Sequence, residues 1–153
     1  MLPPIARAST RRDFIAGIGI AIIALSAPVA MATPDVVAAE VKKLFGDRKF
    51  LDGKIKLDLP TIAENGLVVP LSFDVESPMT EADYVKSVTF FSEGNPNPQL
   101  AAFHFTPMSP KAAASIRIRL AQTQNIIAFA EMSNGDIYTT KREVKVTIGG
   151  CGG

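Results

Sequence analysis

Hydrophobic and polar residues alternate along most of the chain after residue 54. A period of two places successive side chains on opposite faces of a β-strand, so that one face can be buried. The segments with this pattern are residues 54–59, 67–76, 84–91, 100–106, 114–120, 125–132 and 137–148. Short strands at this spacing, with turn residues between them, are typical of an antiparallel sandwich. We expect an all-β, immunoglobulin-like sandwich of about seven strands.

One segment before the strands has a helical period instead. Thr33 suits the N-cap, Pro34 the first helical position and Asp35 the first turn. Apolar residues then recur on one face of a helix, at Val37, Val41, Leu44 and Phe45. Gly46 follows as a stop signal. The pattern predicts one amphipathic helix over residues 34–45.

Turn residues separate the predicted strands. Glu64-Asn65-Gly66 predicts a turn, residues 93–98 predict a loop, and Asn134-Gly135 predicts a hairpin. Pro70 falls inside the second strand, where it cannot donate a backbone hydrogen bond. It therefore predicts an edge position or a bulge at that point.

The N-terminal segment has the features of an export signal. Arg11 and Arg12 form a twin-arginine pair, residues 15–25 are apolar, and Ala30-Met31-Ala32 matches the small residues of a cleavage site. An uncleaved membrane anchor is the alternative, but the apolar stretch is short for a spanning helix. We expect residues 1–32 to be removed during export to the periplasm, which leaves a sandwich domain with its N-terminal helix over residues 33–148.

The sequence finishes with Gly149-Gly150-Cys151-Gly152-Gly153, which contains its single cysteine. Glycine has no Cβ, so this segment can follow many paths, and no adjacent side chain is available to bury the sulfur. Five extended residues reach roughly 17 Å. The composition favours an exposed, functional thiol on a carrier arm over residues 149–153. A disulfide to another chain and an incidental cysteine are the alternatives.

The remaining residue types exclude several classes of function. With a net charge of +1 and no basic run after the N-terminus, nucleic acid is not an expected partner. His104 is the single histidine, so a zinc site of the usual composition cannot be assembled, and we expect no metal or cofactor. Arg117 and Arg119 share one strand face, which we interpret as solvated. A Cys–His pair would require the tail to fold back onto the sheet. The chemistry that remains is that of one thiolate.

Three segments are similar to a known family. Residues 144–153 look like the carboxy-terminal signature of the SoxY family, and residues 116–125 and 68–71 are also similar to it. This family comprises the sulfur-carrier subunits of the bacterial Sox thiosulfate-oxidising system. The resemblance extends over essentially the whole chain after residue 32, and its terminal motif is specific.

The resemblance implies a covalent substrate carrier and not an enzyme. Cys151 would accept thiosulfate by oxidative conjugation on a c-type cytochrome complex, and a hydrolase would then release sulfate and leave a persulfide. A sulfur dehydrogenase, where present, would oxidise the remaining sulfur. The chain would form a heterodimer with a SoxZ-like subunit. The arm would enter each active site in turn, and a large side chain would obstruct it at any of Gly149, Gly150, Gly152 and Gly153.

Three other functions are compatible with parts of the sequence. A Gly-Gly terminus also ends the ubiquitin-like sulfur carriers, but those are cytoplasmic α/β proteins that have no use for a cysteine between the glycines. An exported binding or structural module could dimerise through a Cys151 disulfide. A thiol metal shuttle would need a second soft ligand near the tail.

Overall fold

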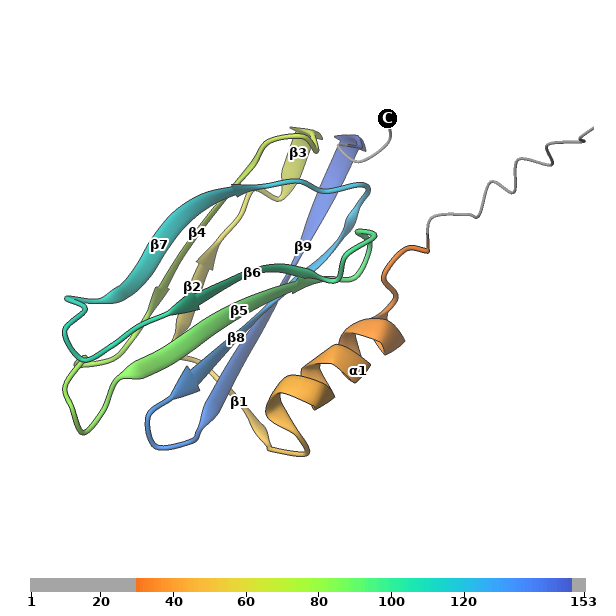
Figure 1. The fold of residues 1–153 in the computed structure, drawn as a ribbon. Helices are drawn as coiled ribbons and strands as arrows, with labels where there is room; N and C mark the ends of the chain where they lie inside the picture. Colours follow the sequence, from red (N-terminus) through yellow and green to blue (C-terminus); the bar gives the residue numbers. More distant parts are fainter. Residues whose placement is uncertain (1–29, 150–153) are drawn as a thin grey trace, which may run out of the picture.

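The computed structural model describes residues 30–149 and shows one helix beside a sandwich of two sheets (Figure 1). The larger sheet has six strands in the order β1-β9-β8-β5-β6, with β3 paired to β9, and the smaller sheet has the order β2-β4-β7. The elements are α1 (Pro34–Phe45), β1 (Phe50–Asp52), β2 (Ile55–Asp58), β3 (Ile62–Asn65), β4 (Val69–Val75), β5 (Val85–Ser92), β6 (Gln99–His104), β7 (Ala112–Ile118), β8 (Gln124–Met132) and β9 (Ile137–Ile148). The predicted all-β sandwich is confirmed, with nine strands in the described residues instead of about seven.

Strand β9 pairs with two short strands, β1 and β3, that the sequence pattern did not predict. Its first residues pair in parallel with β1, Ile137 opposite Phe50, and its last residues pair in parallel with β3, Ile148 opposite Asn65. β8 runs antiparallel along its other edge. Three or four residues are too few to show a period of two. The prediction of a turn over Glu64-Asn65-Gly66 is therefore wrong in part, because its first two residues belong to β3.

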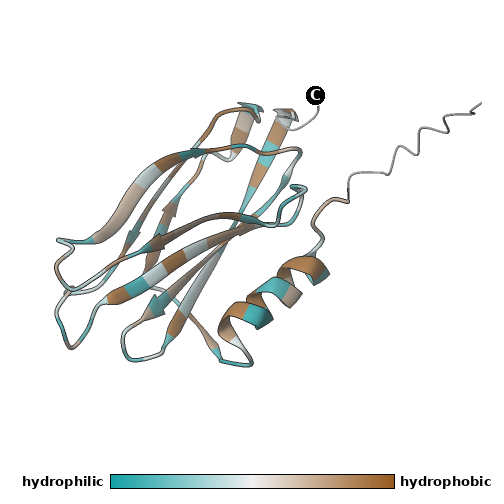
Figure 2. Ribbon diagram, viewed as in Figure 1, coloured by the Kyte–Doolittle hydropathy of each residue, from teal (hydrophilic) through white to brown (hydrophobic). Residues whose placement is uncertain are grey.

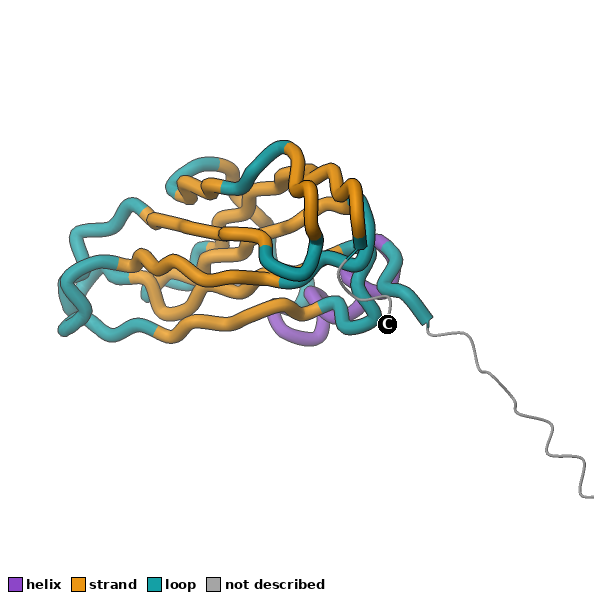
Figure 3. The backbone as a smooth tube through the Cα atoms, turned by 90° about the horizontal axis from the view of Figure 1, so that it is seen from above, coloured by secondary structure: helices purple, strands orange, loops and turns teal. Residues whose placement is uncertain are grey.

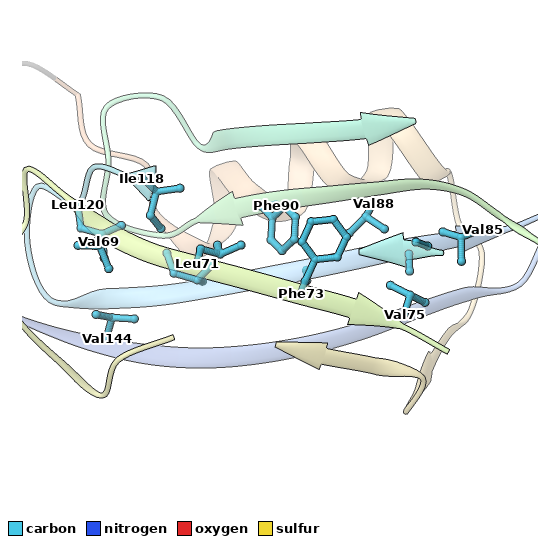
Figure 4. Packing of buried hydrophobic residues seen from close by; sticks show 14 of the residues in the cluster. Val69, Leu71, Phe73, Val75, Val85, Val88, Phe90, Ile118, Leu120 and Val144 are labelled. Carbon is cyan, nitrogen blue, oxygen red and sulfur yellow. The ribbon is translucent and has the colours of Figure 1, made fainter. Parts of the chain in front are cut away.

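The core lies between the two sheets (Figure 4). Apolar and polar residues alternate along the strands (Figure 2), and the apolar residues of β4 are buried. Phe73 of β4 contacts Phe90 of β5, with ring centroids 5.1 Å apart. Burying one such side chain contributes about 1.5–3 kcal/mol. Contacts of this kind hold the smaller sheet against the larger one.

Pro70 lies in β4, the central strand of the smaller sheet, but beyond the part of β4 that pairs with β2, so it occupies an edge position as predicted. β4 is flanked by β2 and β7. The pairing with β2 ends where Asp58 lies opposite Ser72, and Pro70 lies past this point, opposite Arg117 of β7. The missing amide hydrogen of Pro70 is tolerated because β2 does not extend beside it.

Helix α1 packs against the outer face of the larger sheet (Figure 1), and its bounds agree with the prediction. Its buried residues and their partners in the sheet are Val37, Val41, Phe45, Phe91, Phe129 and Ile137. Leu44, which the pattern also placed on the buried face, is 52% exposed. It lies at the margin of the stripe that the other three helical residues form, and the sheet does not reach it.

The loops gather at the two ends of the sandwich, and the described chain finishes at one of them (Figure 3). β9 reaches this end at Ile148, one residue before the described part stops. Within residues 30–149, no helix combines the length and the hydrophobicity that a membrane span requires.

Candidate functional site

The described structure leads to the root of the predicted arm. The arm residues that lie outside the described range are Gly150, Cys151, Gly152 and Gly153. Gly149 is the last residue described, and β9 carries the chain to it from the opposite end of the sandwich (Figure 1). The contacts of Ile148 and Gly149 therefore define where the arm leaves the domain.

The turn after β3 holds the end of β9. The Gly66 N–H donates to the Ile148 carbonyl at 2.7 Å, and the Leu120 N–H donates to the Gly66 carbonyl at 2.8 Å. Asn65 Oδ1 accepts a hydrogen bond from the Leu67 N–H at 2.8 Å, which shapes the same turn. Each bond of this kind contributes a net of about 0.5–1.5 kcal/mol. Gly66 thus connects the last residue of β9 to the segment that follows β7.

Gly149 lies against the carbonyl oxygen of Ala121. A Cβ at Gly149 would overlap that oxygen, so this approach requires a residue without a side chain. Thr123 is two residues after Ala121, and its hydroxyl accepts a hydrogen bond from the Val146 N–H at 2.9 Å. From the sequence alone, Gly149 is expected to contribute to the conformational freedom of the arm. The structure adds a packing requirement at the same residue.

A buried polar network holds Ala121 in place. Asn95 is 6% exposed. Its Nδ2 donates to the Arg119 carbonyl at 2.8 Å, and its Oδ1 accepts from the Ala121 N–H at 2.9 Å. Gln124 Nε2 donates to Asn95 Oδ1 at 2.8 Å, and Gln124 Oε1 accepts from the Gly94 N–H at 2.9 Å. The two amide side chains fix the backbone against which Gly149 lies.

The sequence patterns did not identify this network. The loop over residues 93–98 is confirmed, but Asn95 within it is buried, whereas polar loop residues are ordinarily exposed. One signal was available at Gln124. It precedes Ile126 and Ala128 at a spacing of two, which places it on the buried face of β8. A buried amide requires hydrogen-bond partners, and these are found in the loop.

His104 lies far from the arm root. It is exposed and lies opposite Ser87, which in turn lies opposite Glu131 beside the start of β9. β9 is 12 residues long, so its two ends are roughly 35 Å apart at about 3.3 Å per residue. Cys151 is three residues past Ile148 and reaches about 10 Å beyond it. A Cys–His pair is therefore out of reach within one chain.

The other polar candidates do not form a site with the arm root. Arg117 and Arg119 are both exposed, but Arg119 follows the end of β7, so the prediction that they share one strand is wrong. In the part of the chain that the structure describes, no group of three or more His, Cys, Asp or Glu side chains could hold a metal ion. The hydrogen bond from Lys56 to Glu76, 2.9 Å long, raises the pKa of that exposed amine. Lys56 is protonated at neutral pH in either case.

Comparison with known proteins identifies a sulfur-oxidation family. A family model described as sulfur oxidation protein SoxY matches residues 41–151, a range that includes Cys151. The chain is also similar to the structure of the sulfur carrier protein SoxY from Chlorobium limicola f thiosulfatophilum. The TM-score is 0.62 at 30% identity, covering 73% of this chain and 96% of that one. No curated protein matches the sequence.

Superoxide reductases have a similar fold at low identity. A superoxide reductase (neelaredoxin) from Ignicoccus hospitalis matches with a TM-score of 0.55 at 18% identity, covering 76% of this chain and 94% of that one. A putative superoxide reductase from Thermotoga maritima matches with a TM-score of 0.56 at 13% identity, covering 63% and 93%. At these identities the likeness shows a shared fold alone.

Proposed function

The chain belongs to the SoxY family of sulfur oxidation proteins, and on this premise we propose that it carries sulfur substrates covalently on Cys151. The family and the fold support a carrier role in sulfur oxidation. One observation carries the assignment to Cys151: the family match extends through this residue, the single thiol of the sequence. Close behind it, Gly66, Ala121 and Gly149 give the arm a fixed point of departure.

The proposed chemistry begins with oxidative conjugation of thiosulfate. The Cys151 thiolate forms an S–S bond with the outer sulfur of thiosulfate, and two electrons pass to a c-type cytochrome complex. Water then displaces the sulfonate group, which leaves as sulfate with the release of two protons. The outer sulfur remains on Cys151 as a persulfide. A sulfur dehydrogenase, where present, oxidises that sulfur in place.

The domain supports the arm, and we assign the catalysis to the enzymes that receive it. The groups that hold the root include the backbone of Gly66 and Ala121, the neutral amides of Asn65, Asn95 and Gln124, and the Thr123 hydroxyl. These groups fix the position of the chain at the arm root, and none of them can act as a general base at neutral pH. The role that this arrangement supports is presentation of the thiol.

We further propose a second subunit and a location for the carrier. A SoxZ-like subunit pairs with the chain, and the folded pair is exported to the periplasm. The twin arginines Arg11 and Arg12 and the small residues Ala30-Met31-Ala32 support this route. The proposal predicts that the mature chain begins at Thr33.

Intact mass spectrometry tests the assignment to Cys151. The protein is purified from its host grown on thiosulfate and is measured before and after reduction. We expect adducts heavier by one sulfur atom or by a thiosulfonate group, which map to Cys151 and disappear on reduction. Cys151→Ser is the control and should carry neither adduct. A bare thiol, or a symmetric disulfide alone, would contradict the proposal and favour a module that dimerises through Cys151.

A further inference from the structure

The segment that leads into α1 is held against the loop between β5 and β6. The Ala32 N–H donates to the Asn95 carbonyl at 2.8 Å, and Ala32 is 4% exposed. In Figure 1 this segment runs from the start of α1 past that loop. Ala32 is therefore part of the folded domain, although a mature chain that begins at Thr33 would have lost it.

The residue on the other side of the proposed cleavage site begins the helix. Thr33 is the N-cap of α1: its Oγ1 accepts a hydrogen bond from the Val36 N–H at 3.5 Å, and its carbonyl accepts one from the Val37 N–H at 3.0 Å. Val37 is 3% exposed and packs on the outer face of the larger sheet. The Ala32–Thr33 bond thus lies between a residue held by the loop and a helix held by the sheet.

The loop that accepts Ala32 is itself fixed. The Asn95 side chain is bonded to the Arg119 carbonyl, to the Ala121 N–H and to Gln124 Nε2, and Asn95 is 6% exposed. Breaking the hydrogen bonds of a buried amide leaves polar groups unpaired, which costs more than the bonds contribute when formed. The movement that exposes the Ala32–Thr33 bond is therefore a movement of residues 30–33 and not of the loop.

The requirements of a signal peptidase conflict with this docked arrangement. The enzyme recognises small side chains at the first and third positions before the bond, which are Ala32 and Ala30 here. The susceptibility of a bond to a protease depends on the burial and the hydrogen bonding of the backbone around it. Ala32 cannot enter the active-site cleft of a peptidase while it is buried against Asn95. The docked and the cleavable arrangements of residues 30–33 exclude each other.

We propose that the folded domain shields the Ala32–Thr33 bond, so that a signal peptidase removes the signal segment only when residues 30–33 detach from Asn95. The proposal rests on the export and the cleavage site proposed above. Hydrolysis adds water across the bond and leaves a carboxylate on Ala32 and an ammonium group on Thr33. Its rate follows the population of the detached state when detachment is fast relative to cleavage.

Cleavage of the purified full-length precursor by a signal peptidase in detergent tests the shielding. A synthetic peptide of residues 20–40 is the reference, because its bond has no folded domain to shield it. We expect kcat/KM to be at least about tenfold lower for the precursor than for the peptide. Hydrogen exchange gives a second measurement: the Ala32 amide should exchange at least about tenfold more slowly in the precursor than in the peptide.

One variant releases the segment, and another is its control. Asn95→Ala removes the amide that fixes the loop, so the carbonyl that accepts from Ala32 is no longer held in place. We expect kcat/KM for this precursor to rise at least about threefold above that of the wild type. Asn97→Ala, at an exposed position of the same loop, should change it by less than about 1.5-fold. Neither substitution alters residues 30–33, and circular dichroism checks that both variants are folded.

Three outcomes would overturn the proposal. Equal kcat/KM for the folded precursor and the peptide, with both cut after Ala32, removes the shielding and leaves the export route intact. A folded Asn95→Ala precursor that is cut no faster than the wild type removes the role of Asn95. Failure of the peptidase to cut either substrate after Ala32 removes the proposed cleavage site and the shielding together.

Discussion

At the arm root, the missing side chain of Gly149 and the buried side-chain amide of Asn95 fix the local structure. Gly149 has no side chain to overlap the Ala121 carbonyl, and Asn95 fills a buried position with both of its polar atoms paired. The first feature permits a close backbone approach and the second fixes the partner of that approach. The position of Gly149 against Ala121 depends on both residues.

Replacement of Gly149 by alanine should loosen the end of β9. The added Cβ forces Gly149 away from Ala121, and the hydrogen bond from Gly66 to Ile148 lengthens or breaks. We expect the free energy of unfolding in urea to fall by about 1 kcal/mol. Thr147→Ala, at an exposed position of the same strand, should change it by less than about 0.5 kcal/mol. Equal stability of the two variants would contradict the packing role.

Removal of the Asn95 amide should have a larger effect. Asn95→Ala leaves the part-buried Ala121 N–H and the Arg119 carbonyl without their partner, and we expect a loss of about 1–3 kcal/mol in the free energy of unfolding. Asn97→Ala in the same loop is a matched control, because Asn97 is exposed. A loss of the same size in both variants would show that the loop, and not the network, is responsible.

At the level of elements, helix α1 was predicted to its ends, while β3 was not predicted at all. The helix has local signals at both ends, Thr33 with Pro34 and then Gly46, and twelve residues over which its period repeats. β3 exists because it pairs with the end of β9, and four residues show no period. A local pattern therefore predicts an element such as α1, which has its own capping residues and period, and it does not predict one such as β3, which depends on pairing with a distant strand.

In helix α1, the helical pattern does not distinguish a buried residue from an exposed one at the margin of the apolar face. Phe45 is 6% exposed and Leu44 is 52% exposed, although the pattern assigned both to the buried face. We expect Phe45→Ala to lower the free energy of unfolding by about 3 kcal/mol and Leu44→Ala to lower it by less than about 1 kcal/mol. Thermal or urea unfolding of the two variants measures the difference. Similar losses would mean that Leu44 is covered in solution.

At the scale of the whole molecule, the antiparallel register places His104 and the end of β9 at opposite ends of the larger sheet. The single imidazole of the sequence therefore lies at the end of the sheet opposite to Gly149. We expect His104→Ala to leave the pH dependence of Cys151 alkylation unchanged, because an imidazole roughly 35 Å away contributes negligibly through solvent. A lower or higher apparent thiol pKa in the variant would indicate an approach that the register excludes.

The sequence by itself determined the class of the fold, the bounds of α1, seven of the strands to within a few residues, and the family to which the chain belongs. These follow from periodicity, capping residues and a terminal motif, all of which are local in the chain. Only the tertiary structure decided the pairing of β1 and β3 with β9, the burial of Asn95 and the close approach of Gly149 to Ala121. Each of these is a contact between segments that lie far apart in sequence. Their proximity follows from the packing of the two sheets, which no local pattern records.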